Sequence, residues 1–168
     1  MRILTIIYEF PPIGGGGGRA AYDICCELAA RGHDVTVLTA HMDGLPLDKS
    51  EDGIRVVRIR SRRTEAFAAS FEAMLFYILA GLWVGLRLIL HSRPDVIHTH
   101  FAVPSGALAW MLSMLTNIPY ILTAHLGDVP GGVPLKTARW FRWLKPFTKP
   151  IWRRAKQVVA VSEFTRQL

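Results

Sequence analysis

Short apolar runs alternate with longer segments of helical periodicity along most of this chain. Six runs are nearly continuous in apolar residues, as expected for strands of a parallel sheet that is covered on both faces. These predicted strands are residues 2–8, 35–40, 54–59, 96–99, 120–123 and 157–161. Helical spacing of apolar positions predicts helices at residues 19–31, 66–91, 104–115 and 137–155. The alternation predicts a doubly wound α/β fold, with a mainly parallel sheet and helices on both faces.

Some segments depart from this simple alternation. Residues 43–53 are polar and contain turn residues, which predicts a loop. Residues 54–60 alternate apolar side chains with arginines, which predicts an edge-like strand with one face in water. Gly32 follows the first helix, where a glycine commonly ends a helix. Pro146 and Pro150 are expected to interrupt the last helix.

A run of five glycines is the strongest functional signal in the chain. Gly14, Gly15, Gly16, Gly17 and Gly18 stand between the first predicted strand and Arg19, where the first predicted helix begins. Glycine lets backbone N–H groups approach a ligand closely, and a helix N-terminus adds unpaired donors and a positive dipole end. This order of elements predicts an anion site, most often for phosphate. A plain surface loop is the alternative.

The type of phosphate ligand is narrowed by the neighbouring residues. The run matches the dinucleotide fingerprint only by accident, through Gly15, Gly17 and Ala20. Residues 9–13 separate the strand from the glycines, whereas a dinucleotide loop turns tightly off its strand. The second strand ends without the acid that would hold a ribose, and Asp43 comes slightly late. A P-loop is excluded because no Lys-Ser or Lys-Thr follows the glycines.

Composition indicates one globular domain. The chain has 168 residues, about half of them apolar, which is enough for a substantial core. Cys25 and Cys26 are adjacent in the first predicted helix and point to different faces, so a disulfide between them is not expected. Reduced thiols in a cytoplasmic protein are the simplest interpretation.

Positive charge is concentrated near the end of the chain. The net charge is +7, and residues 129–162 contain eight basic residues and no acid. Aromatic residues are interleaved with them, which suits an anionic membrane surface or a nucleic-acid backbone. A solvated basic face is the alternative, and no groove-reading motif for nucleic acid is present. The candidate patch comprises Arg139, Trp140, Arg142, Trp143, Lys145, Arg153 and Arg154.

The longest apolar run bears on the cellular location. Residues 73–86 form this run, which is shorter than the about 20 residues that a membrane span needs. A long buried helix is therefore predicted, and a helix that dips into a membrane is the alternative. No secretory signal is predicted, because Glu9 directly follows the first apolar run. We expect a cytoplasmic protein, with peripheral contact at the inner face of the membrane as the alternative.

Histidines follow two of the predicted strands. Ligands of doubly wound sheets sit at the carboxyl ends of the strands, which gathers the glycine loop, His100 and His125 at one edge. His125 is followed by Gly127 and Asp128, and a histidine there can donate to a sugar hydroxyl or to a developing charge. His98 and His100 lie on the same side of one strand, but no further ligands at a convincing spacing suggest a metal. No catalytic triad and no hydrolytic pair of acids is apparent.

Five stretches carry a resemblance to a known family, and they lie in order along nearly the whole chain. They read PPIGGG (11–16), LAARGHDVTVLT (28–39), PDVIHTH (94–100), PYILTAHLGDVPG (119–131) and AKQVVAVSE (155–163). Together they resemble the N-terminal domain of the family 4 retaining glycosyltransferases, which have the two-domain GT-B architecture. The resemblance implies that residues 1–168 form one Rossmann-like, acceptor-side domain.

The resemblance also implies roles for the site residues. Gly14 through Gly18 and Arg19 correspond to the loop near the donor phosphates and the acceptor. His125 corresponds to the histidine that touches the transferred sugar, and Asp128 occupies the matching Gly-Asp position. The family uses a nucleotide-sugar donor, needs no metal or other cofactor, and retains the anomeric configuration. The matching region ends near Glu163, so the C-terminal nucleotide-sugar domain is absent and we expect no transfer by these residues alone.

The sequence says less about the acceptor and the partners than about the fold. A glycan or a lipid-linked molecule is the expected acceptor, because the basic aromatic segment and the long apolar helix suggest a place near a membrane. The other expected partner is the missing C-terminal domain, and nucleic acid is not expected. The alternative function is a membrane-surface or anionic-ligand binding module acting through residues 136–156.

Overall fold

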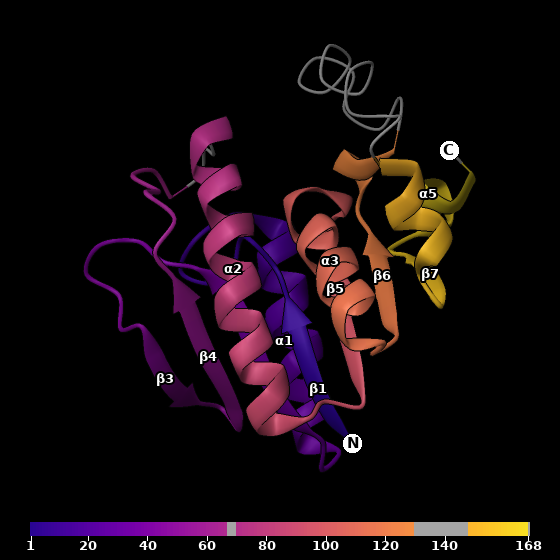
Figure 1. The fold of residues 1–168 in the computed structure, drawn as a ribbon. Helices are drawn as coiled ribbons and strands as arrows, with labels where there is room; N and C mark the ends of the chain where they lie inside the picture. The colour runs from indigo at the N-terminus through magenta and orange to yellow at the C-terminus, as the bar shows by residue number, and fades with distance from the viewer. Residues whose placement is uncertain (67–69, 130–147, 168) are drawn as a thin grey trace.

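A seven-stranded sheet forms the centre of the fold. The computed structural model describes residues 1–66, 70–129 and 148–167. The strands run in the order β3-β4-β2-β1-β5-β6-β7, and every neighbouring pair is parallel except β3 with β4 (Figure 1). They are β1 (Arg2–Ile6), β2 (Asp34–Ala40), β3 (Asp48–Glu51), β4 (Ile54–Ile59), β5 (Val96–His100), β6 (Tyr120–Ala124) and β7 (Gln157–Ala160). The order steps outward from β1 in both directions, which confirms the predicted doubly wound sheet.

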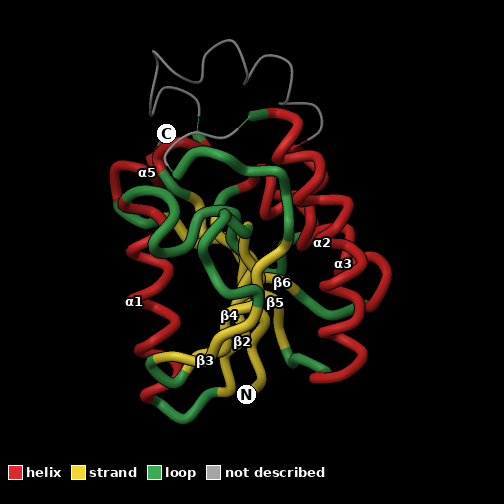
Figure 2. Tube along the Cα trace, turned by 90° about the vertical axis from the view of Figure 1, so that its left-hand side faces the viewer, coloured by secondary structure: helices red, strands yellow, loops and turns green. Residues whose placement is uncertain are grey.

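Helices cover both faces of the sheet. Figure 2 shows α1 (Gly16–Ala30) on one face and α2 (Phe71–Ser92) and α3 (Ala107–Thr116) on the other. Residues 148–154 are also helical, and α5 (Glu163–Gln167) closes the described chain. Two clusters of buried side chains lie on the two sides of the strands, the larger one under α2 and α3.

Close packing of α2 on α3 depends on two glycines. A Cβ added to Gly81 would lie 2.6 Å from Leu108 of α3, and one added to Gly85 would lie 2.7 Å from Leu112. Both distances are far below a normal carbon–carbon contact, so side chains at these positions would push the helices apart. By length and composition, α2 could also cross a membrane, a test that core helices of globular domains pass as well.

The opposite face holds α1 against β1 and β2. Cys25 of α1 is fully buried beside Thr5, and burial raises the pKa of its thiol to about 11. Cys26 is partly exposed, and both thiols are free. Gly32 follows the helix at a φ of +83°, a conformation that favours glycine, as predicted for the end of this helix.

Several predicted elements are corrected by the structure. Residues 48–51 of the predicted loop form β3, which pairs antiparallel with β4 and makes β3, not β4, the edge strand. The second helix does not begin at Ala66: it begins at Phe71, where the Ser70 hydroxyl caps the Ala73 N–H at 3.1 Å. Residues 67–69 of that prediction lie outside the described residues. A strand needs only a partner with free backbone groups, so the polar segment 48–51 could pair without an apolar pattern.

The last two predicted helices also differ. The α-helix of α3 starts at Ala107, because the preceding turn Ala102–Gly106 is irregular, with Val103 extended at φ −136° and ψ 133°. Of the helix predicted at 137–155, residues 148–154 are helical and include Pro150, while 137–147 lie outside the described residues. Pro150 therefore does not break the described helix. α5 was not predicted.

Candidate functional site

The predicted site residues meet at the carboxyl edge of the sheet. β1 leads into the glycine loop, β5 ends with His100, and His125 directly follows β6. Because β1 and β6 both pair with β5, these three strand ends are neighbours in the sheet. Figure 1 shows this edge at the upper end of the strands. The sequence rule for doubly wound sheets therefore placed these residues correctly.

The glycines of the loop face in different directions. Gly15 caps α1, which begins at Gly16, and a Cβ added at either position would meet nothing within 4 Å. A Cβ at Gly17 would lie 2.4 Å from the Phe101 ring, and one at Gly18 would lie 2.6 Å from the backbone carbonyl of Glu9. A Cβ at Gly14 would likewise lie 2.4 Å from the Glu9 Cβ, so three glycines of the loop press against the protein and two face open space at the start of a helix.

Three histidines lie side by side behind the loop. Nδ1 of His100 lies 3.2 Å from Nε2 of His125, within hydrogen-bond distance, and Nε2 of His98 lies 2.8 Å from the Thr123 hydroxyl. The rings of His98 and His100 are 4.4 Å apart. Nε2 of His100 is buried without a hydrogen-bond partner in the described residues. These contacts join the ends of β5 and β6 through side chains that water hardly reaches.

Burial keeps this cluster uncharged. It lowers the pKa of His98 to about 4 and, together with the neighbouring histidines, that of His100 to about 2. The pKa of His125 is also lowered by burial. A neutral imidazole can both donate and accept a hydrogen bond, so His125 is suited to hold a polar ligand group at neutral pH.

Phe101 links the histidines to the glycine loop. Its ring stacks on His125 with centroids 4.1 Å apart, and it also lies under Gly17. Its backbone has a φ of +67°, a left-handed conformation that residues other than glycine rarely adopt. Backbone strain of this kind is often found at functional sites. Sequence reasoning missed Phe101, because neither its backbone angle nor its ring orientation leaves a pattern in the sequence.

Asp128 ties two loops together. Its carboxylate accepts hydrogen bonds from the backbone N–H groups of His125 at 2.9 Å and of Ala102 at 2.8 Å. Burial raises the pKa of Asp128 to about 6, against the effect of these two hydrogen bonds. The side chain therefore holds the loops after β5 and β6 in place, and these contacts engage both of its oxygens.

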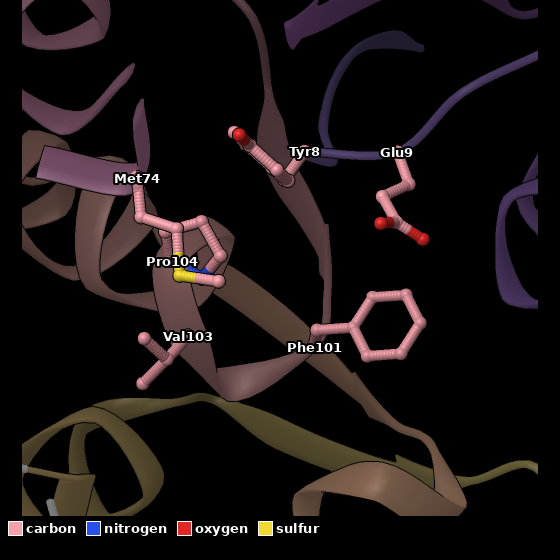
Figure 3. A pocket seen from close by; sticks show the side chains of 6 residues that line it. All are labelled: Tyr8, Glu9, Met74, Phe101, Val103 and Pro104. Carbon is pink, nitrogen blue, oxygen red and sulfur yellow. The ribbon is translucent and has the colours of Figure 1, made fainter. Parts of the chain in front are cut away.

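A half-open pocket lies beside Phe101. It has a volume of about 180 Å³ and lies between the end of β1, the first turn of α2 and the turn Ala102–Gly106 (Figure 3). Figure 3 shows the six residues that line it, namely Tyr8, Glu9, Met74, Phe101, Val103 and Pro104. Most of this lining is apolar, and Glu9 is its only charged side chain. Sequence reasoning assigned Glu9 no role in a site.

The remaining predicted residues lie at or outside this region. Arg19 is exposed on α1, where it pairs with Asp23 at 3.1 Å. Gly127 belongs to the short turn after His125, and Arg153 and Arg154 are exposed on the helical residues 148–154. The rest of the candidate patch, residues 139–145, lies outside the described residues. The roles assigned to all of these residues, and to the glycines and histidines above, stay predictions.

Fold and site together define a Rossmann-like domain whose ligand edge carries a glycine loop and a histidine. The family model for the glycosyl transferase 4-like domain matches residues 15–168. The chain belongs to this family of glycosyltransferase domains, as the sequence resemblance predicted.

Curated relatives support the same assignment. The chain is 33% identical to a glycogen synthase of Mycobacterium tuberculosis over 141 residues, which cover 74% of this chain and 33% of the relative. It is 34% identical to a D-inositol 3-phosphate glycosyltransferase of Corynebacterium diphtheriae over 134 residues, which cover 74% of this chain and 31% of the relative. The chain thus spans about a third of the length of these relatives.

A solved structure confirms the fold class. Sucrose-phosphate synthase from Thermosynechococcus elongatus superposes with a TM-score of 0.76 at 21% identity, over 94% of this chain and 41% of that chain. At this identity the likeness concerns the fold alone. It agrees with the predicted Rossmann-like half of a GT-B architecture.

Proposed function

We propose that this chain is the acceptor-side domain of a two-domain glycosyltransferase. The whole enzyme transfers a sugar from a nucleotide-sugar to a hydroxyl group of a glycan or lipid-linked acceptor, with retention of configuration and without a metal. The C-terminal domain supplies the grip on the nucleotide, so residues 1–168 are inactive alone. The observation that carries this proposal is the contact of Gly17, Phe101 and His125, which sets a neutral histidine beside the N-terminus of α1.

The chemistry of this contact suits a sugar-phosphate. The first N–H groups of α1 have no partner within the helix, and the dipole of the helix favours a negative group there. Gly15 and Gly16 face open space, so nothing on these residues blocks a phosphate from the amides. His125 lies next to this position and offers a ring nitrogen to a sugar hydroxyl or to charge that develops during transfer.

The parent enzyme that contains both domains is the right material for a test. We would screen nucleotide-sugars for thermal stabilisation and then measure transfer with the His125→Ala and Gly16→Val variants. Stabilisation by one nucleotide-sugar and a loss of turnover in both variants is the expected result. His33→Ala is the matched control, because His33 precedes β2 at the opposite edge of the sheet. Unchanged turnover in His125→Ala would overturn the proposed role of this histidine.

A peripheral membrane contact is a second proposal, and the surface of α2 favours it. Leu75, Leu79, Trp83 and Leu90 are exposed on one side of this helix, and the Arg87 guanidinium lies 4.7 Å from the Trp83 ring centroid. No acid occurs between residues 73 and 94. An apolar stripe next to arginines suits the interface of an anionic membrane, and a lipid-linked acceptor would be presented there.

Liposome sedimentation tests the membrane proposal. The chain should sediment with vesicles that contain anionic lipid at low salt, and less with neutral vesicles. The double variant Leu79→Gln/Trp83→Gln should stay in the supernatant, whereas Leu47→Gln, an exposed leucine outside α2, should behave like the parent chain. Equal sedimentation of all variants would remove α2 from the proposal.

A further inference from the structure

Glu9 occupies a special position in the pocket beside the site. Its carboxylate is the only charged group among the six lining residues, and Figure 3 shows it pointing towards the Phe101 ring. The other side chains offer aromatic rings, a thioether and aliphatic carbons, and Tyr8 also carries a buried hydroxyl without a hydrogen-bond partner among the described residues. A ligand in this pocket therefore meets one charged hydrogen-bond acceptor in a mostly apolar setting.

A buried arginine holds this carboxylate in place. Nη2 of Arg63 donates to Oε1 of Glu9 at 3.1 Å, and the Arg63 side chain is only 1% exposed. Arg63 also donates to the backbone carbonyls of Glu65 and Ala66, and its guanidinium lies 4.6 Å from the ring centroid of Tyr8. These contacts fix the orientation of Arg63, so Glu9 is anchored through a single oxygen.

The second oxygen of Glu9 is available to a ligand. The Glu9 side chain is 29% exposed, and no donor among the described residues bonds to Oε2. The glycine loop makes room for it, because a Cβ at Gly14 would lie 2.7 Å from this oxygen and 2.4 Å from the Glu9 Cβ. The glycine at position 14 thus leaves space beside the Glu9 carboxylate, of which one oxygen is bonded to Arg63 and the other has no donor among the described residues.

The chemistry of the pocket selects for neutral hydroxyl groups. A carboxylate oxygen accepts hydrogen bonds and donates none, so it offers a partner to hydroxyls and none to phosphate or carboxylate groups. The Phe101 ring and the aliphatic side chains suit the C–H faces of a sugar or cyclitol ring. We propose that this pocket binds an uncharged polyol ring of the acceptor, with Glu9 as the residue that orients its hydroxyls. This inference rests on the proposed glycosyltransferase function.

The position of the pocket fits this use. Phe101 connects it to His125, because Phe101 lines the pocket and its ring stacks on the histidine. A polyol held against Phe101 would therefore lie close to the histidine beside the glycine loop. Glu9 is accordingly a positioning residue for the acceptor in this proposal.

Methyl NMR on the chain itself tests the proposal, because Met74 lines the pocket. The chain is labelled at its methionine methyl groups, and the Met74 signal is assigned with Met74→Leu. D-Glucose and myo-inositol are titrated as neutral probes, and D-glucuronate serves as the charged counterpart of glucose. We expect a neutral probe to shift the Met74 signal with millimolar affinity and glucuronate to bind about tenfold more weakly or less.

Variants separate binding from folding. Glu9→Gln should weaken the neutral probe about tenfold, since the amide replaces a charged acceptor. Glu72→Gln is the control, because Glu72 is an exposed acid of α2 that pairs with Arg62 outside the pocket. Val103→Phe fills the pocket from the turn Ala102–Gly106 and leaves the residues Glu9 and Arg63 themselves unchanged, so it should abolish the shift if Glu9→Gln proves unstable.

Three outcomes would overturn the inference. The first is a Met74 signal that neither neutral probe shifts, the second is equal binding of glucuronate, and the third is unchanged binding in Glu9→Gln and Val103→Phe.

The test is independent of the proposed function. A silent pocket in a parent enzyme that still uses a nucleotide-sugar would sink this inference alone. Polyol binding in a parent that responds to no nucleotide-sugar would sink the proposed function and leave the pocket standing.

Discussion

The inner wall and the outer lip of the site are built from adjacent residues but follow opposite rules. The inner wall consists of Gly17, Gly18, Phe101, His100 and His125, where added Cβ atoms collide and the histidines are buried. The outer lip consists of Gly15, Gly16 and Glu9, where the glycines face open space and the acid is partly exposed. Neighbouring glycines in one run thus serve two purposes, since one pair permits packing and the other leaves room for a ligand.

This difference separates stability from binding in the same loop. Changes in the inner wall should alter folding first, because added atoms there collide with the protein. Changes at Gly15 and Gly16 of the outer lip should leave folding intact and alter only what binds.

Gly18→Val should cause the largest loss of stability. The new side chain would meet the Glu9 carbonyl, a backbone atom that cannot swing aside, so we expect a cost of about 3 kcal/mol. Chemical denaturation of the isolated chain measures this cost. A loss below about 1 kcal/mol would show that the inner wall is less tightly packed than the structure indicates.

Acid should next weaken the histidine cluster, in which His98 packs against His100 of the inner wall. The pKa of His98 is about 4 in the fold and 6.5 in the unfolded chain, so the unfolded state binds more protons below pH 6.5. The stabilising contribution of neutral His98 is therefore complete above pH 6.5 and is lost as the pH falls towards 4. At pH 5 the loss is about 2 kcal/mol.

The comparison with His98→Gln isolates this effect, since the amide can keep the hydrogen bond to Thr123. Because the pKa of Asp128 is raised to about 6, this residue adds stability as the pH falls from 7 to 5, which is opposite to the effect of His98. The quantity to measure is therefore the difference in stability loss between the parent chain and His98→Gln. Unfolding curves at pH 7 and pH 5 suffice. Parallel losses in the two proteins would mean that His98 is accessible to water.

Gly17→Ala should have a smaller effect on stability. The added methyl group meets the Phe101 ring, which can rotate away, and alanine favours the helix by about 1 kcal/mol over glycine. We expect a net change within about 1 kcal/mol, together with a displaced Phe101 ring. Chemical shifts of the His125 ring would report the lost stacking. An unperturbed His125 would contradict the contact between loop and histidine.

Gly16→Val should change the stability least. Its side chain would point into open space, and the cost of a β-branched residue in a helix is no larger than that of the glycine it replaces. The melting temperature of the isolated chain should therefore stay nearly constant. In the parent enzyme the same variant should lose stabilisation by the nucleotide-sugar, and a variant that binds normally would remove the glycine loop from the donor site.

The sequence predicted the central parallel strands, and the edge of the sheet at which the site residues lie, better than it predicted the edge strand and the helix ends. The central strands could be recognised by their apolar runs. Because these strands are parallel, the glycine loop, His100 and His125 were expected at the same edge of the sheet. β3 was missed because its residues, Asp48–Glu51, carry no apolar pattern and depend on β4 for pairing.

The contacts of Glu9 and the backbone of Phe101 could not be predicted from the sequence, for another reason. The ion pair of Glu9 with Arg63 joins residues 54 positions apart, and neither residue stands in a recognisable motif. The strained backbone of Phe101 is imposed by contacts of the folded chain, since a phenylalanine by itself does not favour a positive φ. Local patterns reveal which strand ends carry polar groups, but the pairing of distant side chains has to come from the structure.

The double hydrogen bond of Asp128 has a mechanical consequence. One carboxylate accepts hydrogen bonds from the backbone N–H groups of Ala102 and His125. The segments that follow β5 and β6 are therefore joined to each other through this side chain. Phe101 directly precedes Ala102, so a displacement of the Phe101 backbone would also strain the backbone at His125.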